Sequence, residues 1–428
     1  MATRDIQAGD CLVCVPESLL LTATQLRSHY SRELARCSTA PQTHTLMAYH
    51  VAAERVRGAE KSRIWPYISV LPGDFDTLPV CYPMSLRALL PDTVQEMAQQ
   101  QRERIDLGFA TLCSEFLHQN LSAPRITAET FEWGWLNDGS DTAMPGDCVA
   151  MAPFLDMLNH HPDAQMRAYF DTKTRCYTIR TDNTFHRGRQ AFISYGPHDN
   201  CFLLGEYGFV TADNRYNHVL LGIKELRALA DAVAKSTKET AQSALRERRG
   251  MRSRYDRRPV TVACTQVDAA ADMDEKMRFL EQEGLLGDYA LYSDGEIPLR
   301  LVNALRIWLL PQFRTENQET QRAIHIWRQS LYSEACSVDK LAQASGSQLV
   351  PESAVWMAVK MMLVQATRLA EDRLEQLRHL GTTLETRFQL GLTFTRQLWE
   401  ESLAILRICL GTACRHLDCE SIDTQHAG

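Results

Sequence analysis

The sequence predicts an α+β protein, because short stretches of strand-like pattern alternate with longer stretches of helical pattern. Short apolar runs typical of strands occur at 11–22 and again between 149 and 223. Apolar residues three and four apart, which indicate helices, dominate 26–137 and return from 224 almost to the end of the chain. The simplest architecture with this pattern is a β-rich core interrupted by helices and followed by an all-α lobe.

The first elements can be assigned in order along the chain. "CLVCVPESLLLT" at 11–22 predicts a strand, a turn at Pro16 and a second strand. "THTLMAYHVAAERVRG" predicts a helix that ends at Gly58, and the run at 92–119 predicts a longer amphipathic helix. Between these helices, "IWPYISVLP" is aromatic and bounded by prolines, which favours a packed turn.

The later elements return to strands and then to helices. "RAYFD", "CYTIRT", "QAFISYG" and "HVLLGI" each have the length and composition of a short strand. Beyond Lys224 every long apolar segment has helical spacing. We therefore predict two domains, 1–222 and 223–428, with a helical insert at about 26–137 in the first.

Length and charge limit the classes of function. A chain of 428 residues with 45% hydrophobic content is long enough for two domains. A formal net charge of -7 disfavours an electrostatic grip on nucleic acid over the whole surface. The one basic run, "LRERRGMRSRYDRR" at 245–258, is interpreted as a solvated helix end and loop, with a nuclear-import patch as the alternative. We expect no direct nucleic-acid binding, because this run contains a single aromatic residue, Tyr255.

Cysteine usage and hydropathy indicate a soluble intracellular protein of the cytoplasm and nucleus. Thirteen cysteines are scattered mostly through apolar segments, as free thiols are in a reducing compartment. No apolar run reaches the roughly 18 residues that cross a bilayer, and the N-terminus lacks the apolar core of a signal peptide. Cys11 and Cys14 form a C-x-x-C pair with no helix after it, which disfavours a redox motif, and Cys414 with Cys419 lacks a second pair, so we expect no metal site. Without a spanning or signal segment we also expect no membrane partner.

Three short motifs identify a family. "FLDMLNHHP" contains Asn159 and His160, "ISYGPHDN" contains Tyr195, and "GEYGFV" contains Tyr207. In this order they resemble the core of the SET-domain protein methyltransferases, in the branch that includes the RuBisCO large-subunit lysine methyltransferase and SET domain-containing proteins 3, 4 and 6. The motif forms are most similar to those of the SET domain-containing protein 4 group. "SRIWPYISVLP" and "RLVNALRIWLL" resemble further elements of that branch.

The resemblance implies a fold, an activity and residue roles. It implies a β-rich SET core threaded as a pseudoknot, an exception to unthreaded topology, with a helical insert and a helical C-terminal substrate-binding lobe. It implies S-adenosyl-L-methionine as cofactor and a histone or non-histone protein lysine as acceptor. The residue that matches the catalytic position is Tyr207. Those that match cofactor-binding positions are Asn159, His160 and Tyr195. Those that match the lysine side of the channel are Asp156, Tyr169 and Tyr216.

Methyl transfer from a sulfonium to an amine explains why the motifs hold so few reactive groups. The reaction is an in-line displacement with a neutral leaving group, so it needs no metal and no oxyanion hole, and alignment is the main task. A free lysine amine titrates near 10.4, and a dry aromatic channel disfavours its charged form. The sequence therefore predicts a narrow aromatic passage.

Two departures from the family pattern keep a second hypothesis open. The Gly-rich turn that approaches the cofactor in the family has no counterpart after Met1, and no Arg lies between Asn137 and Arg167 to pair with the cofactor carboxylate. Losing one carboxylate partner costs about 2–5 kcal/mol, by analogy with truncated buried charge pairs. The alternatives are a catalytically inactive protein-binding module and, since one relative modifies histidine, a histidine methyltransferase.

Overall fold

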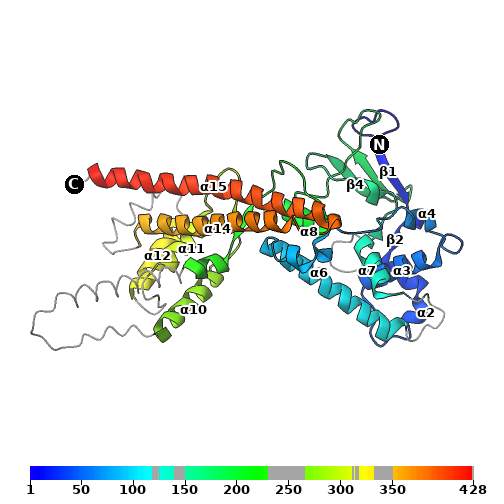
Figure 1. The fold of residues 1–428 in the computed structure, drawn as a ribbon, viewed down its shortest axis with the longest axis horizontal. Coiled ribbons are helices and arrows are strands. Elements are labelled where there is room, and N and C mark those ends of the chain that lie inside the picture. The colour runs from blue at the N-terminus through cyan, green and yellow to red at the C-terminus, as the bar shows by residue number, and fades with distance from the viewer. Residues whose placement is uncertain are drawn as a thin grey trace, which may run out of the picture. The chain divides into compact units, whose positions relative to one another are not determined.

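The structure, a computed structural model, describes residues 1–117, 124, 126–138, 150–229, 266–310, 313, 318–331 and 350–426. The chain forms two compact units. The first comprises Met1–Asn217 with Glu375–Leu398, and the second comprises His218–Leu374 with Trp399–Gly428. Both units mix helices with small antiparallel sheets, so the predicted α+β class is confirmed (Figure 1).

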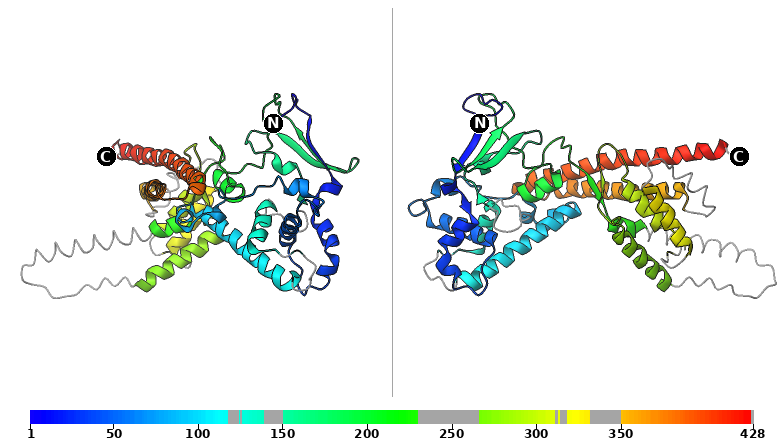
Figure 2. Two further views of the ribbon diagram at one scale, coloured as in Figure 1. Left: turned by 45° about the vertical axis from the view of Figure 1, so that its right-hand side comes forward. Right: turned by 180° about the vertical axis from the view of Figure 1, so that it is seen from behind.

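The sheet of the first unit has three antiparallel strands in the order β1-β5-β4 (Figure 2). They are β1 (Cys11–Pro16), β4 (Met166–Asp171) and β5 (Cys176–Thr181). A second ladder pairs β2 (Leu21–Thr22) with β3 (Ala150–Met151). Side chains alternate between the two faces of a strand, and one face of the sheet joins a small apolar cluster with Val13, Val15 and Ile179.

The helical insert has its own core. Its helices are α1 (Ala23–His29), α2 (Ser31–Leu34), α3 (Thr43–Arg57), α4 (Trp65–Ile68), α5 (Met84–Arg87), α6 (Asp92–Thr111) and α7 (Ala128–Asp138). A 3-10 turn lies at Pro79–Cys81, and a π-helical turn at Leu112–Leu117 follows α6. Helix α3 is buried along most of its length, and α7 approaches it so closely that a Cβ on Gly134 would lie 2.3 Å from the Ala48 carbonyl oxygen. This pair is the centre of the insert.

Helix α8 (Asn200–Tyr207) ends at a residue that the sequence singled out. Asp199 caps its N-terminus by accepting a hydrogen bond from the Phe202 N–H at 2.9 Å. Gly208 ends it in the left-handed conformation, with φ 74°, where a side chain would also meet Thr77 at 2.8 Å. The helix therefore stops with Tyr207 as its last residue, close to the segment around Thr77.

The second unit pairs β6 (Val219–Leu221) with β7 (Tyr289–Leu291), and its other described elements are helices. Its helices are α10 (Gln266–Gln282), α11 (Leu299–Trp308) and α12 (Gln318–Leu331), together with parts of α14 (Glu352–Leu380) and α15 (Gln389–His426). Buried Lys276 caps α11 by donating to the carbonyl oxygens of Trp308 at 2.9 Å and Leu310 at 2.7 Å.

Most predicted elements are present, but the strand predicted for "QAFISYG" is wrong. There, Ile193 makes an isolated bridge: its N–H donates to the Asn159 carbonyl at 3.0 Å and its carbonyl accepts from the His161 N–H at 2.9 Å. The basic run at 245–258 lies outside the described residues. Within the part of the chain that the structure describes, no helix is long and apolar enough to cross a bilayer.

The two units differ from the predicted domain limits in two ways. The first unit stops at Asn217, so the "HVLLGI" strand lies in the second unit, and Glu375–Leu398 joins the first. This late segment packs there because Gln397 donates to the Thr211 carbonyl at 3.1 Å and Gly391 lies against the Tyr82 ring. The boundary predicted at residue 222, between a first domain at 1–222 and a second at 223–428, stays a prediction.

Candidate active site

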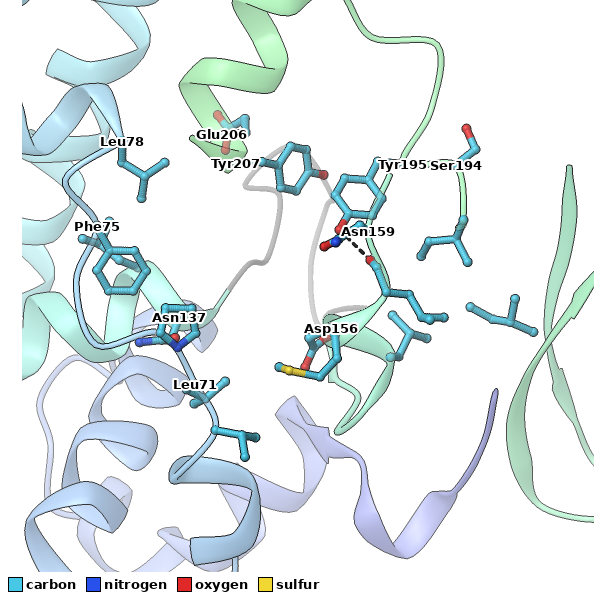
Figure 3. Close-up of a pocket in the computed structure, with 18 of the residues that line it drawn as sticks. Leu71, Phe75, Leu78, Asn137, Asp156, Asn159, Ser194, Tyr195, Glu206 and Tyr207 are labelled. Atoms are coloured by element: carbon cyan, nitrogen blue, oxygen red, sulfur yellow. Dashed lines mark hydrogen bonds between the residues drawn. The ribbon is translucent and has the colours of Figure 1, made fainter. Parts of the chain in front are cut away.

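A cavity of about 830 Å³ lies in the first unit (Figure 3). We call its polar side the tyrosine wall, which comprises 155–159, 193–195 and 206–207. We call the opposite side the insert wall, which comprises 70–72, 74–75, 77–78 and 136–137. The described lining is completed by Ala150 and by four sheet residues: Met166, Ala168, Tyr177 and Ile179. The cavity thus joins all three predicted motifs to the helical insert.

Two tyrosine rings lie side by side on the tyrosine wall. The ring centroids of Tyr195 and Tyr207 are 4.8 Å apart, and Phe209 lies within 6.2 Å of both. The Tyr195 hydroxyl donates to the Leu158 carbonyl at 2.7 Å. Burial, helped by Tyr207 and the Asp156 charge, raises the pKa of Tyr195 to about 12. Tyr195 therefore stays protonated at neutral pH and serves as a fixed hydrogen-bond donor.

The two residues of the Asn-His pair have different environments: Asn159 lines the cavity and His160 is buried. The bridge to Ile193 holds the backbone of Asn159, which lines the cavity, while His160 lies behind it and is 7% exposed. The His160 Nδ1 accepts a hydrogen bond from the Tyr195 N–H at 3.0 Å. Burial, followed by the neighbouring histidines, lowers the pKa of His160, so the ring is neutral with its hydrogen on Nε2. His160 fixes Tyr195 rather than lining the cavity.

A strained residue precedes the pocket-lining turn. Phe154 has φ 74°, which is unusual for a bulky side chain, and it is 63% exposed. The 3-10 turn Leu155–Met157 follows at once and supplies three lining residues. Strain of this kind persists where the surroundings over-determine the backbone, often at functional sites.

The charged lining is acidic. Asp156 stands on the tyrosine wall and accepts a hydrogen bond from the Tyr67 hydroxyl. Glu206 and Asp74 add two further carboxylates, and the described lining residues include neither Lys nor Arg. A cleft lined by one sign of charge concentrates ligands of the opposite sign. This cavity therefore favours a cation.

The structure does not bring two of the predicted substrate-side residues to the cavity. Tyr169 follows Ala168 on β4 and so lies on the opposite face of the strand, 42% exposed, where Arg180 donates to its hydroxyl at 3.3 Å. Tyr216 lies in a turn where the Arg215 guanidinium sits 5.1 Å from its ring centre. Neither tyrosine is among the lining residues. The strand register sets the direction of the Tyr169 side chain, and the turn sets the position of Tyr216.

Asn137 and the insert wall were not predicted as part of the site. Asn137 donates to the Trp133 carbonyl at 2.9 Å, and its buried Oδ1 has no hydrogen-bond partner among the described residues. Asn137 lies in the last turn of α7, and the segment 70–78 begins within the "SRIWPYISVLP" element that resembles the family. The local sequence does not indicate which residues of the insert face the cavity. Tertiary packing alone brings the insert wall opposite residues 155–159.

The arrangement of these groups suits two tasks: aligning two reacting molecules and selecting a positively charged ligand. It offers phenol hydroxyls, an amide and carboxylates around an aromatic interior, and the described residues contain no group of three or more metal ligands. Hydroxyl and amide groups held in place can orient a reacting amine and a bound cofactor without acting as nucleophiles.

Comparison with known proteins agrees with these motifs. Residues 1–196 match the family model of the SET domain. SET domain-containing protein 4 of Mus musculus is 33% identical over 233 residues, which are 50% of this chain and 52% of that protein. The actin-histidine N-methyltransferase of Canis lupus familiaris is 26% identical, over 72% of this chain and 54% of that protein. The chain thus spans about half the length of these curated relatives.

The fold has solved counterparts. A crystal structure of the SET domain of LSMT bound to lysine and AdoHcy superposes with a TM-score of 0.60 over 96% of this chain and 83% of that chain, at 14% identity. A structure of Rubisco LSMT bound to AdoMet has a TM-score of 0.58 over 97% and 84%, at 15% identity. These similarities establish the fold of the chain.

Proposed function

We propose that this chain, which contains a SET domain, is an S-adenosyl-L-methionine-dependent protein-lysine N-methyltransferase that acts on histone or non-histone proteins. The observation that carries the proposal is one cavity lined by Tyr195, Tyr207 and Asn159 together with three carboxylates. The ribosomal lysine N-methyltransferase set11 of Schizosaccharomyces pombe, 29% identical over 35% of this chain, supports the reaction class. A cytoplasmic and nuclear location stays part of the proposal.

The residues present fit the cofactor. A volume of about 830 Å³ lies in the range of small-molecule and cofactor sites, and the buried Asn137 Oδ1 is an acceptor without a partner among the described residues. S-adenosyl-L-methionine would supply a methyl group on a sulfonium. Asn159 and Tyr195 would hold it directly, and His160 would act by fixing Tyr195.

The residues of the tyrosine wall would prepare the acceptor. The carboxylates of Asp156 and Glu206 attract a lysine ammonium, and the aromatic interior favours its neutral amine once the proton has left to water. The Tyr207 hydroxyl would then orient the amine so that its lone pair attacks the methyl carbon. The cofactor, when bound, would supply the methyl group to this amine and would keep the electron pair of the broken C–S bond on sulfur. The methylated amine releases its second proton to solvent.

The acidic lining favours lysine over histidine as the acceptor. At neutral pH a lysine side chain is cationic, whereas an imidazole with an ordinary pKa near 6.5 is mostly neutral. The three carboxylates therefore attract lysine more strongly as it enters. Matched peptides with a central lysine or histidine would test this choice, and transfer mainly to histidine would contradict it.

The second candidate is a binding module of the same fold that transfers no methyl group. It is favoured by the described lining, which provides no Lys or Arg to pair with a cofactor carboxylate. A module of this kind would hold lysine-containing partners without binding cofactor.

Calorimetry separates the two candidates. Titration with S-adenosylhomocysteine should show binding that the substitution Asn159→Ala weakens at least tenfold. Labelled S-adenosyl-L-methionine with a mixture of lysine-centred peptides should then label the peptides. If millimolar S-adenosylhomocysteine gives no heat and no label is transferred, the chain is not a methyltransferase.

A further inference from the structure

We infer that Tyr67 is a positioning residue of this site, which holds the Asp156 carboxylate at the cavity and ties the helical insert to the tyrosine wall. The inference rests on the proposed function, because it assigns Asp156 to the acceptor. Tyr67 lies in α4 and Asp156 lies 89 residues further along the chain. Their contact joins the "IWPYISVLP" element to the "FLDMLNHHP" motif.

The two partners differ in burial. Tyr67 is 8% exposed and belongs to the apolar core of the insert, so its ring has little freedom. Asp156 lines the cavity and is solvent-exposed, and an exposed carboxylate can adopt several rotamers. A hydrogen bond from a fixed donor to an ionised acceptor is among the stronger kinds and selects one rotamer. The rigid core thereby sets the direction of the cavity carboxylate.

The insert wall beyond Tyr67 is anchored to buried side chains of the insert. The Trp133 Nε1 donates to the Pro72 carbonyl at 2.8 Å, and the Tyr82 hydroxyl donates to the Thr77 carbonyl at 2.9 Å. Trp133 is 8% exposed and Tyr82 is 2% exposed. The wall is thus held along its length, and the Tyr67 bond extends this anchoring to the opposite side of the cavity.

Asp156 is close enough to influence the tyrosines. Its charge contributes to the raised pKa of Tyr195, whose ring lies 4.8 Å from that of Tyr207. The proposed function assigns this carboxylate to the acceptor amine. The cofactor side is held separately, by the Ile193 bridge to Asn159 and by the His160 bond to Tyr195. Loss of the Tyr67 hydroxyl should therefore affect the acceptor and spare the cofactor.

The substitution Tyr67→Phe tests this division, with Tyr30→Phe as the matched control. Tyr30 belongs to the same core, is 4% exposed and also has a hydroxyl hydrogen bond, to the His50 Nδ1 at 2.8 Å, but His50, unlike Asp156, does not line the cavity. We expect Tyr67→Phe to raise KM for a mixture of lysine-centred peptides about tenfold, the low end for a bond to a charged group. The kcat and the affinity for S-adenosylhomocysteine should change less than twofold. Tyr30→Phe should leave all three unchanged.

A double-mutant cycle makes the test specific. If Tyr67 acts through Asp156, the pair Tyr67→Phe with Asp156→Asn should be no worse in KM than Asp156→Asn alone. Additive effects, an equal rise in Tyr30→Phe, or a loss of cofactor affinity in Tyr67→Phe would overturn the inference.

Measuring peptide binding tests the role of Tyr67 even if the chain proves not to be a methyltransferase. If the unmutated chain transfers no methyl group, the proposed function fails, and the same peptides are titrated by fluorescence anisotropy in the presence of S-adenosylhomocysteine. Weaker binding to Tyr67→Phe than to Tyr30→Phe supports the positioning role. Equal affinities, or no peptide binding by the unmutated chain, overturn it.

Discussion

The tyrosine wall and the insert wall enclose one cavity but are built in different ways. The tyrosine wall combines irregular backbone, held by the Ile193 bridge and the turn after Phe154, with the end of helix α8 at Glu206 and Tyr207. Most of the insert wall is the non-helical segment 70–78, and only Leu136 and Asn137 belong to a helix, α7. Hydrogen bonds from the Trp133 and Tyr82 side chains tie this segment to the insert. Of the polar groups proposed for chemistry, Asp156, Asn159 and Tyr195 thus lie on turns and irregular backbone, whereas Tyr207 lies at the end of a helix.

This difference predicts two kinds of variant. Changes to the tyrosine wall should alter rates while the protein stays folded. Changes deep in the insert should alter stability first, and the site only as a consequence. Four predictions follow from this contrast, from the largest expected effect to the smallest.

The substitution Tyr207→Phe should lower the methyl-transfer rate about 100- to 1,000-fold, as loss of one preorganised hydrogen-bonding group does in other enzymes. The affinity for S-adenosylhomocysteine should change less than twofold. Initial rates and calorimetry measure both. Tyr216→Phe is the informative companion, because the family resemblance implies a place for Tyr216 beside the acceptor, whereas the structure does not place it in the cavity lining. Near-normal methyl-transfer rates in Tyr216→Phe would support the cavity as the active site. A large loss in Tyr216→Phe together with near-normal rates in Tyr207→Phe would contradict the assignment of the active site to the tyrosine wall.

Acidification should destabilise the insert through His50. Burial, the largest cause, lowers the pKa of His50 to about 4, against the opposing charge of Glu54. The unfolded state, with a pKa near 6.5, binds a proton before the folded state does. Stability is therefore full above about pH 6.5 and falls between about pH 6.5 and 4, by at most about 3 kcal/mol.

Urea unfolding at pH 7.5, 5.5 and 4.5 measures this loss. The substitution His50→Gln should flatten the dependence. His186→Gln, at a side chain that is 81% exposed, should keep it. Equal slopes for the unmutated chain and His50→Gln would show that the insert does not titrate through His50.

A glycine pair tests the packing of the insert. Gly134→Ala should cost about 2–3 kcal/mol, because the new Cβ would lie 2.3 Å from the Ala48 carbonyl oxygen between α3 and α7. Gly73→Ala, beside the insert wall, meets nothing within 4 Å and should change stability by less than about 0.5 kcal/mol. Thermal unfolding compares the two, and equal midpoints would contradict the close approach of the helices.

The carboxylates of the two walls should contribute unequally to peptide KM. Asp156→Asn should raise KM for lysine-centred peptides about tenfold, since Tyr67 holds this group at the cavity. Asp74→Asn, on the exposed insert wall, should raise it about twofold. Peptide kinetics at low and high salt measure both, and a larger effect at Asp74 would reverse the assignment of the acceptor side.

Local patterns were sufficient where neighbours along the chain decide the structure. The helix that ends at Gly58, the strands at 11–22 and the α+β class follow from hydrophobic period and caps. The three motifs likewise indicated Asn159, Tyr195 and Tyr207, which the structure brings to one cavity.

Tertiary structure decided everything that depends on partners far along the chain. Tyr169 points away because of its place in the β4 register, and His160 turns inward to bond Tyr195. The insert wall and the Tyr67 contact join segments that nothing in the local pattern pairs. By itself, the sequence determined which residue types and elements the protein has, since propensity and periodicity act over a few residues. Only packing decided which side chains share the cavity, because burial and hydrogen bonding there are satisfied by residues distant in sequence.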